Sequence, residues 1–556
     1  MKNRKKLLAL LLAVCMLTTM LAACGNAAEV VSTSPSDAQQ NGAEAEAATT
    51  PNEESTEEKV VTMGSTAPWE ALHPLASNRD QHVAFLYPIY ESWVTLTNEG
   101  EIIPRLFESW EQDAENPRIL YCKLNQKATW SDGTPITAHD IVFTMELGSD
   151  PALPITTRQV VTNFVGTDDT GMRIEGEEFG VSAVDDYTVM LHYKDMVAPT
   201  VLNELYCLRY TFTLPKHILE NIPVESVLTD PFWENPVTSG AFTIDGIISG
   251  ERIEYVARDD YYLGRPQMDR LIIRVVTADN MLSAYLAGEI DCTTYGSAMS
   301  LADYEMVKEE GKLSTFEAPG FGNNHILINN QTMDQNARLA MDCAIDKQTI
   351  IDGVLYGYAR PAISAIVPEN PYRCTSVSGN PFDVELAKEY LAKSSYDTSR
   401  PVRLVVPSTS AVGQQMSVLV QQNLAAIGLN VSIETYDSTT VSSMLFAGDY
   451  DIALMQSASN PFEPSESKFY FQELNRGWLN MPDTNWEDLY NKAAVDSTLE
   501  KRKVYYDELQ ERLVAEVPMI FLYHPDVLFV YSDKISGMDF ASFSLKSWRY
   551  EEWEVK

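Results

Sequence analysis

Hydrophobic and polar residues alternate with a period of two in several short segments, which is typical of half-buried strands. Between these segments, apolar positions recur every three or four residues, as on one face of a helix. The strands predicted in this way are residues 60–64, 118–124, 187–193, 252–257, 271–276, 326–328, 403–406, 430–434, 451–455 and 519–523. The predicted helices include residues 281–286, 336–345, 413–427 and 504–516. Strands separated by helices indicate largely parallel sheets with crossover connections.

The start of one helix is marked by its capping residues. Thr137 can cap the first turn, and Asp140, three residues later, can bond back to it. The pattern therefore predicts a helix that begins just after Thr137, preceded by a turn at Asp132 and Gly133.

Only the N-terminus is apolar enough to enter a membrane. Basic side chains within residues 2–6 precede an apolar stretch at residues 7–20, which is the layout of a secretory signal. The next four residues, Leu21-Ala22-Ala23-Cys24, resemble the bacterial lipobox. That resemblance implies a lipoprotein signal peptide at residues 1–23 and a lipidated Cys24. The alternative is an N-terminal membrane anchor that stays uncleaved.

The charge of the chain excludes one class of partner. The 556 residues contain 79 acidic and 41 basic side chains, a net charge of −38. Removal of residues 1–23 deletes four basic side chains and no acidic one, so the charge becomes −42. Such a chain repels phosphate backbones, which argues against nucleic acid. Residues 25–58 carry eight acids and no Lys or Arg, so residues 24–58 are expected to form a lipidated cysteine with a flexible acidic tether.

Catalytic and metal-binding patterns are absent from the sequence. It contains no CxxC or HExxH spacing, no GxSxG elbow and no P-loop, so we expect no catalytic residue, cofactor or metal site. The disulfide state stays open, because an odd number of cysteines follows Cys24: Cys122, Cys207, Cys292, Cys343 and Cys374. Buried single thiols are the preferred interpretation.

Several segments in a fixed order carry a resemblance to a known family. They include Tyr90-Glu91-Ser92-Trp93, Pro104-Arg105-Leu106, Trp130-Ser131-Asp132-Gly133, Tyr261-Tyr262, Ala287-Gly288-Glu289-Ile290-Asp291 and Gly448-Asp449-Tyr450-Asp451. From about residue 59 to the C-terminus, the chain resembles the family 5 solute-binding proteins of oligopeptide and dipeptide ABC importers.

The resemblance implies an α/β, two-lobed, periplasmic-binding-protein-like fold. Mixed sheets flanked by helices would form two lobes with a ligand cleft between them, the first lobe enlarged by an extra subdomain. The implied boundaries are residues 59–98, 236–319 and 525–556 for lobe 1, 99–235 for its inserted subdomain, and 320–524 for lobe 2. The chain would cross between the lobes near residues 318–321 and 523–526.

The implied function is that of an extracytoplasmic receptor, lipid-anchored to the outer face of the cell membrane, or periplasmic in a Gram-negative host. It would capture a peptide or related small solute as a monomer and deliver it to the permease subunits of an ABC importer, without catalysis. A non-peptide solute such as an oligosaccharide, metal chelate or opine remains an alternative, as does a sensing role. From another class, a secreted glycoside hydrolase is the fallback.

The resemblance also implies the ligand-binding candidates. In peptide-binding members, an aspartate in a Trp–x–x–Asp-like loop pairs with the ligand's α-ammonium. Here Ser457 falls on the tryptophan position and Asn460 on the aspartate position, so a neutral amide replaces the charge and Glu463 is the substitute. His325, next to one crossing, is the most cleft-like histidine. The candidates are Asn78, Arg79, Tyr295, Phe321, Asn323, Ser459, Asn460, Phe462, Glu463 and Tyr523.

Overall fold

The structure, a computed structural model, covers most of the chain beyond its N-terminal segment. It describes residues 58–69, 71–75, 83–96, 102–155, 158, 161–194, 212–457, 464, 468, 470–471, 476–481, 485–495, 498–538 and 549–556. All of them lie in one of the two contact units of the chain, Glu57–Lys556. The predicted signal peptide, Cys24 and most of the predicted tether lie outside the described residues.

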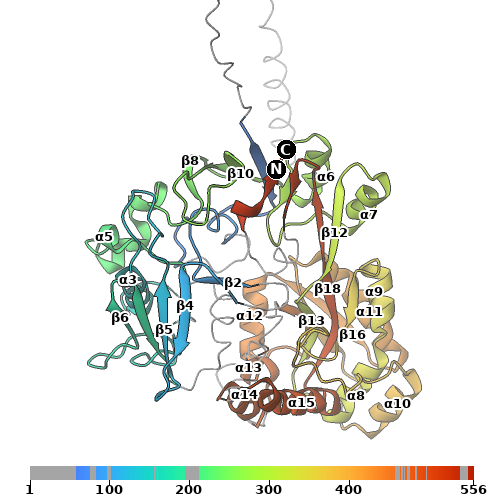
Figure 1. Cartoon of the computed structure of the whole chain (residues 1–556). Helices are drawn as coiled ribbons and strands as arrows, with labels where there is room; N and C mark the ends of the chain where they lie inside the picture. The colour runs from blue at the N-terminus through green and yellow to red at the C-terminus, as the bar shows by residue number, and fades with distance from the viewer. Residues whose placement is uncertain are drawn as a thin grey trace, which may run out of the picture. The chain divides into compact units, whose positions relative to one another are not determined.

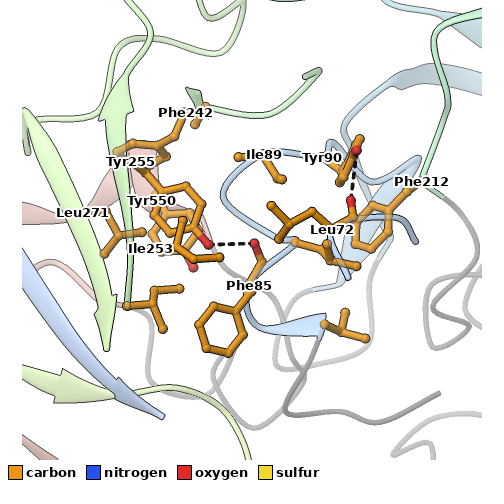
Figure 2. Packing of buried hydrophobic residues seen from close by; sticks show 14 of the residues in the cluster. Leu72, Phe85, Ile89, Tyr90, Phe212, Phe242, Ile253, Tyr255, Leu271 and Tyr550 are labelled. Carbon is orange, nitrogen blue, oxygen red and sulfur yellow. Dashed lines mark hydrogen bonds between the residues drawn. The ribbon is translucent and has the colours of Figure 1, made fainter. Parts of the chain in front are cut away.

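A five-stranded mixed sheet forms the first core. Its strands, in the order β11-β1-β10-β9-β8, are β11 (Cys292–Thr293), β1 (Val60–Ser65), β10 (Arg270–Val275), β9 (Arg252–Ala257) and β8 (Phe242–Ile248). β1 is parallel to β10 and β11, whereas β9 is antiparallel to both of its neighbours. The predicted alternation in β9 buries Ile253 and Tyr255, and the Tyr255 hydroxyl donates to the carbonyl of Phe85 at 3.0 Å (Figure 2). This core therefore joins the sheet to the loop around Phe85.

A seven-stranded sheet forms the second core. Its strands are β12 (Ser314–Pro319), β18 (Met519–Tyr531), β13 (Asn323–Ile328), β17 (Ile452–Ser457), β15 (Val402–Pro407) and β16 (Val431–Tyr436), with β14 (Ala359–Pro361) paired to β18. Alternate residues of β15 serve opposite faces: Leu404 and Val406 share one apolar cluster and Val405 belongs to another. The sheet is therefore covered by apolar side chains on both faces.

Helices cover the two faces of this sheet (Figure 1). The cluster with Leu404 includes residues of α8 (Gln335–Ala344), α9 (Lys347–Val354), α10 (Val384–Lys393) and α11 (Ala411–Ala426). The cluster with Val405 includes residues of α12 (Ser438–Ala447), α13 (Arg476–Leu479), α14 (Asn485–Val495) and α15 (Leu499–Glu516).

Strand β18 belongs to both cores. Residues 519–523 pair with β13, and residues 526–531 pair with β12. Ile520 and Leu522 are buried in the second core, whereas Phe529 is buried in the first. The predicted strand at residues 519–523 is confirmed, but it continues eight residues further, to Tyr531.

A third, antiparallel sheet has the order β4-β5-β7-β6 and packs with α3 (Ala138–Ser149). Its strands are β4 (Phe107–Gln112), β5 (Ile119–Leu124), β7 (Thr188–His192) and β6 (Val181–Asp185). The predicted helix start is confirmed, because the Asp140 carboxylate accepts from the Thr137 backbone N–H at 2.8 Å.

The remaining elements are short or lie next to the first core. They are β2 (Val94–Leu96), β3 (Ile102–Pro104), α5 (Lys216–Leu219), η1 (Val224–Thr229), η2 (Pro231–Glu234), α6 (Ala278–Leu286), α7 (Leu301–Glu310), β19 (Ile535–Ser536), η5 (Tyr550–Glu552) and β20 (Glu554–Val555). Among the described residues, no helix is both long and apolar enough to cross a bilayer.

The expectation of largely parallel sheets is wrong. Within the part of the chain that the structure describes, only β1 with its two neighbours and β15 with its two neighbours pair in parallel, and the other pairings are antiparallel. Short turns explain the difference, since β8 and β9 are separated by a tight turn with Gly250 at φ 73°, which reverses the chain without a crossover. The mixed sheets implied by the resemblance are confirmed. Four cysteines are buried free thiols: Cys122, Cys292, Cys343 and Cys374.

Candidate functional site

The structure describes four of the candidate ligand-binding residues. These are Tyr295, Phe321, Asn323 and Tyr523. The others, together with Cys24, lie outside the described residues: Asn78, Arg79, Ser459, Asn460, Phe462 and Glu463. The described part of the candidate site consists of the elements that flank these positions.

The two connections between the cores lie against each other. β12 ends at Pro319 and β13 begins at Asn323, so Gly320 to Gly322 form the first connection, while β18 carries the second. A Cβ atom on Gly320 would lie 2.2 Å from the Pro525 carbonyl oxygen. The His524 Nδ1 lies 2.9 Å from the Gly322 carbonyl oxygen. The two backbones thus approach closely, and only glycine fits at position 320.

Arg360 of β14 binds both connections. Its Nη2 donates to the Gly320 carbonyl at 2.8 Å, and its guanidinium lies 3.5 Å from the Asp526 carboxylate. Burial raises the pKa of the Asp526 carboxyl, an effect that Arg360 partly opposes. Nothing in the sequence around Arg360 signals this role, because it depends on the pairing of β14 with β18.

Tyr358, two residues earlier, reaches from the second core to a separate apolar cluster that includes Tyr304 and Val307 of α7. Its chain neighbour Ala359 is buried in the second core, but its own ring packs against Tyr304 of α7 with centroids 5.5 Å apart. Its hydroxyl donates to Glu305 and accepts from Lys308 Nζ, the latter at 2.9 Å. The segment 358–360 therefore braces the connections from one side. Sequence reasoning missed it.

A chain of polar side chains stands where β13 and β17 meet. Asn323 and Ser457 are register partners at the first residue of β13 and the last of β17, and the Asn323 Nδ2 donates to Ser457 Oγ at 2.9 Å. The Asn323 Oδ1 lies 2.7 Å from His325 Nδ1. His325 is fully buried, and burial lowers its pKa to about 3. The imidazole is therefore neutral at physiological pH.

The aromatic residues near this chain pack as core. Tyr470 lies edge-on to His325 with ring centroids 5.0 Å apart, and Phe471 stacks on Trp486 at 4.8 Å. Trp478 contacts Phe446, 5.5 Å between centroids, and is part of the same apolar surroundings. These rings therefore belong to the apolar cluster on one face of the second sheet.

The four described candidates are only partly brought together. Tyr523 is the register partner of Asn324, so it lies on the strand next to Asn323, and it is buried in the second core. Burial raises the pKa of its hydroxyl, so the group stays protonated. Phe321 is half-buried within the first connection, whereas Tyr295 follows β11 and packs against the first core. Asn323 and Tyr523 are therefore the two described candidates that the structure brings onto adjacent strands.

Three of the family-like segments meet at one buried arginine. Arg105 Nε donates to Glu91 at 3.0 Å, and its Nη2 donates to the Tyr261 hydroxyl at 2.8 Å. Tyr261 donates to Glu91, and Arg105 also pairs with Glu551 near the C-terminus. These residues, the Arg105 cluster, are a structural tie rather than a binding site, because each charge is already paired. In the described part of the chain, no group of three or more His, Cys, Asp or Glu side chains could hold a metal ion.

Two cores that share one strand and are linked by adjacent connections define the two-lobed class of periplasmic binding proteins. Residues 101–476 match the model of the bacterial extracellular solute-binding proteins, family 5, middle region. This match covers more than half of the chain, so the chain belongs to that family.

Curated relatives and solved structures agree with this assignment. The oligopeptide-binding protein AppA of Bacillus subtilis is 24% identical over 97% of this chain and 96% of its own length. A Brucella ovis protein is 25% identical over 62% of each chain, so the match spans about three fifths of that relative. The substrate-binding protein CtaP of Listeria monocytogenes has a TM-score of 0.77 at 21% identity, covering 90% of this chain and 100% of its own. NikZ of Campylobacter jejuni, solved with Ni(L-His), has a TM-score of 0.72 at 19% identity, covering 90% and 100%.

Proposed function

We propose that the chain is an extracytoplasmic receptor that captures a peptide between its two lobes and delivers it to the permease of an ABC importer, without turnover. The observation that carries the proposal is the family match over residues 101–476. The close connections at Gly320 and Pro525 support it, since two short linked segments allow the lobes to rotate about them. Closure would shield the peptide's amides from water and strengthen their hydrogen bonds.

The ligand is tested first by native mass spectrometry of the purified protein, with identification of any molecule that co-purifies. A peptide bound one to one and released intact supports the proposal. Thermal shift against peptide and sugar panels then ranks the classes, because a ligand at one hundred times its Kd adds about 2.7 kcal/mol of stability. Hydrolysis of a peptide or glycoside would instead favour the secreted glycoside hydrolase or another enzyme.

A second candidate is a non-peptide solute in the same fold. Asn460 stands where the aspartate of peptide-binding members is expected, so no fixed charge awaits an α-ammonium there. The similar fold of NikZ, solved with Ni(L-His), is consistent with ligands other than peptides. Asn460→Asp should strengthen binding of peptides with a free N-terminus over N-acetylated ones. If Asn460→Asp binds free and N-acetylated peptides equally well, Asn460 does not contact the N-terminus of the ligand. Glu463→Gln would then test whether Glu463 binds the ammonium instead.

We also propose that the receptor is a monomer held at the outer face of the cell membrane by lipid on Cys24. The lipobox-like Leu21-Ala22-Ala23-Cys24 supports this. Labelled palmitate should be incorporated into the wild type and not into Cys24→Ala. Retention of the processed Cys24→Ala protein at the membrane would contradict the anchor.

A further inference from the structure

We propose that Tyr358, Ala359 and Arg360, which we call the brace, restrict the rotation of the two lobes and thereby strengthen ligand binding. The proposal rests on the proposed function, in which the lobes rotate about the two connections to enclose a ligand. None of the three is among the candidate ligand-binding residues, so the brace acts through the relative position of the lobes.

The brace is fixed to the second core through its backbone. Arg360 is the register partner of His524 where β14 pairs with β18. The Asp526 N–H donates to the Tyr358 carbonyl at 3.1 Å, and Ala359 is buried in the second core. The brace therefore moves with the part of β18 that belongs to the second core.

The side chain of Arg360 acts close to the axis of the rotation. It reaches the Gly320 carbonyl of the first connection at 2.8 Å and the Asp526 carboxylate of the second at 3.5 Å. These groups flank the closest approach of the two connections, where a Cβ atom on Gly320 would lie 2.2 Å from the Pro525 carbonyl oxygen. A rotation displaces atoms in proportion to their distance from its axis, so these contacts change little. Arg360 therefore holds the axis without limiting the angle.

The side chain of Tyr358 reaches away from the connections, to α7. Its hydroxyl donates to Glu305 and accepts from Lys308 Nζ, the latter at 2.9 Å. The Lys308 ammonium also lies over the Tyr358 ring, 5.1 Å from its centroid. Both partners belong to α7, which precedes the first connection in the chain.

Helix α7 is packed on the side of the first sheet. Its residue Tyr304 shares an apolar cluster with Met281 and Ile290. A Cβ atom on Gly64 of β1 would lie 3.1 Å from the side chains of both Met281 and Ile290, so this cluster lies against the first sheet. The Tyr358 hydroxyl thus joins a helix that moves with the first core to a segment that moves with the second. Because its partners lie on α7 rather than on a connection, a rotation of the lobes must stretch these bonds.

The contacts of Tyr358 restrain the lobes without locking them. Lys308 and its partner Glu317, 2.6 Å away, are both exposed, so water can replace these bonds at a small cost. The bonds to Glu317 and Tyr358 raise the pKa of Lys308, so its ammonium stays charged at neutral pH. An unliganded receptor that samples fewer lobe orientations loses less entropy on binding and holds a larger binding-competent fraction. The brace therefore favours tighter binding.

Distances between spin labels on the two lobes test the restraint in the full-length protein without ligand. Leu286→Cys in α6 and Val418→Cys in α11, both at exposed positions, carry the labels, and labelling of the parent protein corrects for native thiols. Tyr358→Phe keeps the ring and removes the hydroxyl. The share of molecules outside the main distance peak should then rise roughly five-fold, the change that loss of one net hydrogen bond allows. Lys308→Met, which removes the same contact from α7, should have a similar effect.

The matched control is Tyr436→Phe, which removes a tyrosine hydroxyl that donates to Glu434 at 3.2 Å within the second lobe. This bond does not join the lobes, so its loss should leave the distance distribution unchanged. An unchanged distribution in Tyr358→Phe, or equal broadening in Tyr436→Phe, would overturn the proposal.

Affinity is measured separately, with a random tetrapeptide library and native mass spectrometry. If the wild type retains peptides, Tyr358→Phe should retain them roughly five-fold more weakly, whereas Tyr356→Phe, at an exposed tyrosine, should match the wild type. Equal or stronger retention by Tyr358→Phe would contradict the proposal. If the wild type retains no peptide, the proposed peptide function fails, and the distance measurement alone decides whether the brace restrains the lobes.

Discussion

The Arg105 cluster and the crossing region differ in how they use polar groups. We define the crossing region as Gly320, Asn323, His325, Ser457 and His524. The Arg105 cluster is built from family-like segments and buries full charges in mutual contact. The crossing region has only neutral polar groups at its centre, and its two buried histidines have lowered pKa values.

This difference distinguishes polar groups that fix the fold from polar groups that could contact a ligand. A buried charge that is fully paired favours one arrangement of the chain, because any other leaves it unpaired. A neutral polar chain leaves its outer groups able to exchange partners at a small cost. The family-like segments therefore specify how the first lobe and C-terminus assemble. We propose that the ligand class is set where the chain departs from the family pattern, at Ser457 and Asn460.

The largest expected effect comes from breaking the Arg105 cluster. Arg105→Met should lower the free energy of unfolding by about 3–5 kcal/mol, because it leaves Glu91 buried without its cation. Urea unfolding followed by circular dichroism measures this. The matched control is Arg403→Met, which removes partly exposed ion pairs with Glu434 and Asp449 and should cost about 0–1 kcal/mol. An equal loss of unfolding free energy in Arg105→Met and Arg403→Met would mean that the Arg105 cluster stabilises the fold no more than an exposed ion pair does.

Mild acid should weaken the crossing region next. Burial lowers the pKa of His325 to about 3 and that of His524 to about 4, from an ordinary 6.5. The unfolded chain therefore binds protons between pH 6.5 and these values while the folded chain does not, so stability falls as the pH falls. At pH 5 each histidine should cost about 2 kcal/mol relative to pH 7.5.

The groups around each histidine define the controls for this measurement. His524 faces Arg360, Arg373 and Glu369, whereas burial alone accounts for His325. His325→Phe should flatten the decline in urea-measured stability between pH 7.5 and pH 5. His139→Asn, at an exposed histidine, is the control. An unchanged slope in His325→Phe would show that this imidazole is not kept neutral by the fold.

Much of the fold can be predicted from the sequence, because a half-buried strand requires apolar and polar residues to alternate. The predicted strand at residues 252–257 matches β9, since Ile253 and Tyr255 alternate with polar residues. β4 gave no such signal, because four of its six residues are exposed. The prediction for β18 stops too early. Proline is rare inside a strand because it has no N–H to donate, yet Pro525 lies within β18, at the point where the strand passes from one core to the other.

The candidate site was less predictable, because its contacts depend on register. Asn323 and Ser457 are far apart in sequence, and only the pairing of β13 with β17 brings them together. Arg360 and Tyr358 act through the pairing of β14 with β18, which no local pattern encodes. Sequence resemblance did place Asn323 and Tyr523 at the connections, and the structure puts them on adjacent strands.

Gly320→Ala should give an intermediate effect. The new Cβ would lie 2.2 Å from the Pro525 carbonyl oxygen, so the two connections must separate. We expect a loss of about 1–3 kcal/mol in the free energy of unfolding. Gly353→Ala in α9 is the matched control, because its Cβ would meet no atom within 4 Å and alanine should stabilise the helix by up to about 1 kcal/mol. A neutral Gly320→Ala would show that the connections tolerate separation.

The smallest expected effect comes from the brace at Tyr358. Tyr358→Phe keeps the ring against Tyr304 but removes the hydroxyl that joins Glu305 and Lys308, so it should cost about 1 kcal/mol in the free energy of unfolding. Tyr356→Phe, at an exposed tyrosine two residues earlier, should be neutral. The brace joins the start of β14 to α7, so its loss should also speed hydrogen exchange in residues 317–322. Arg403→Met should leave the exchange of those residues unchanged. If Tyr358→Phe alters neither stability nor that exchange, the crossing region is held by the paired backbones and by Arg360 with its acidic partners Asp526 and Glu369. Its contrast with the Arg105 cluster is then between a partly exposed ion pair and a fully buried one.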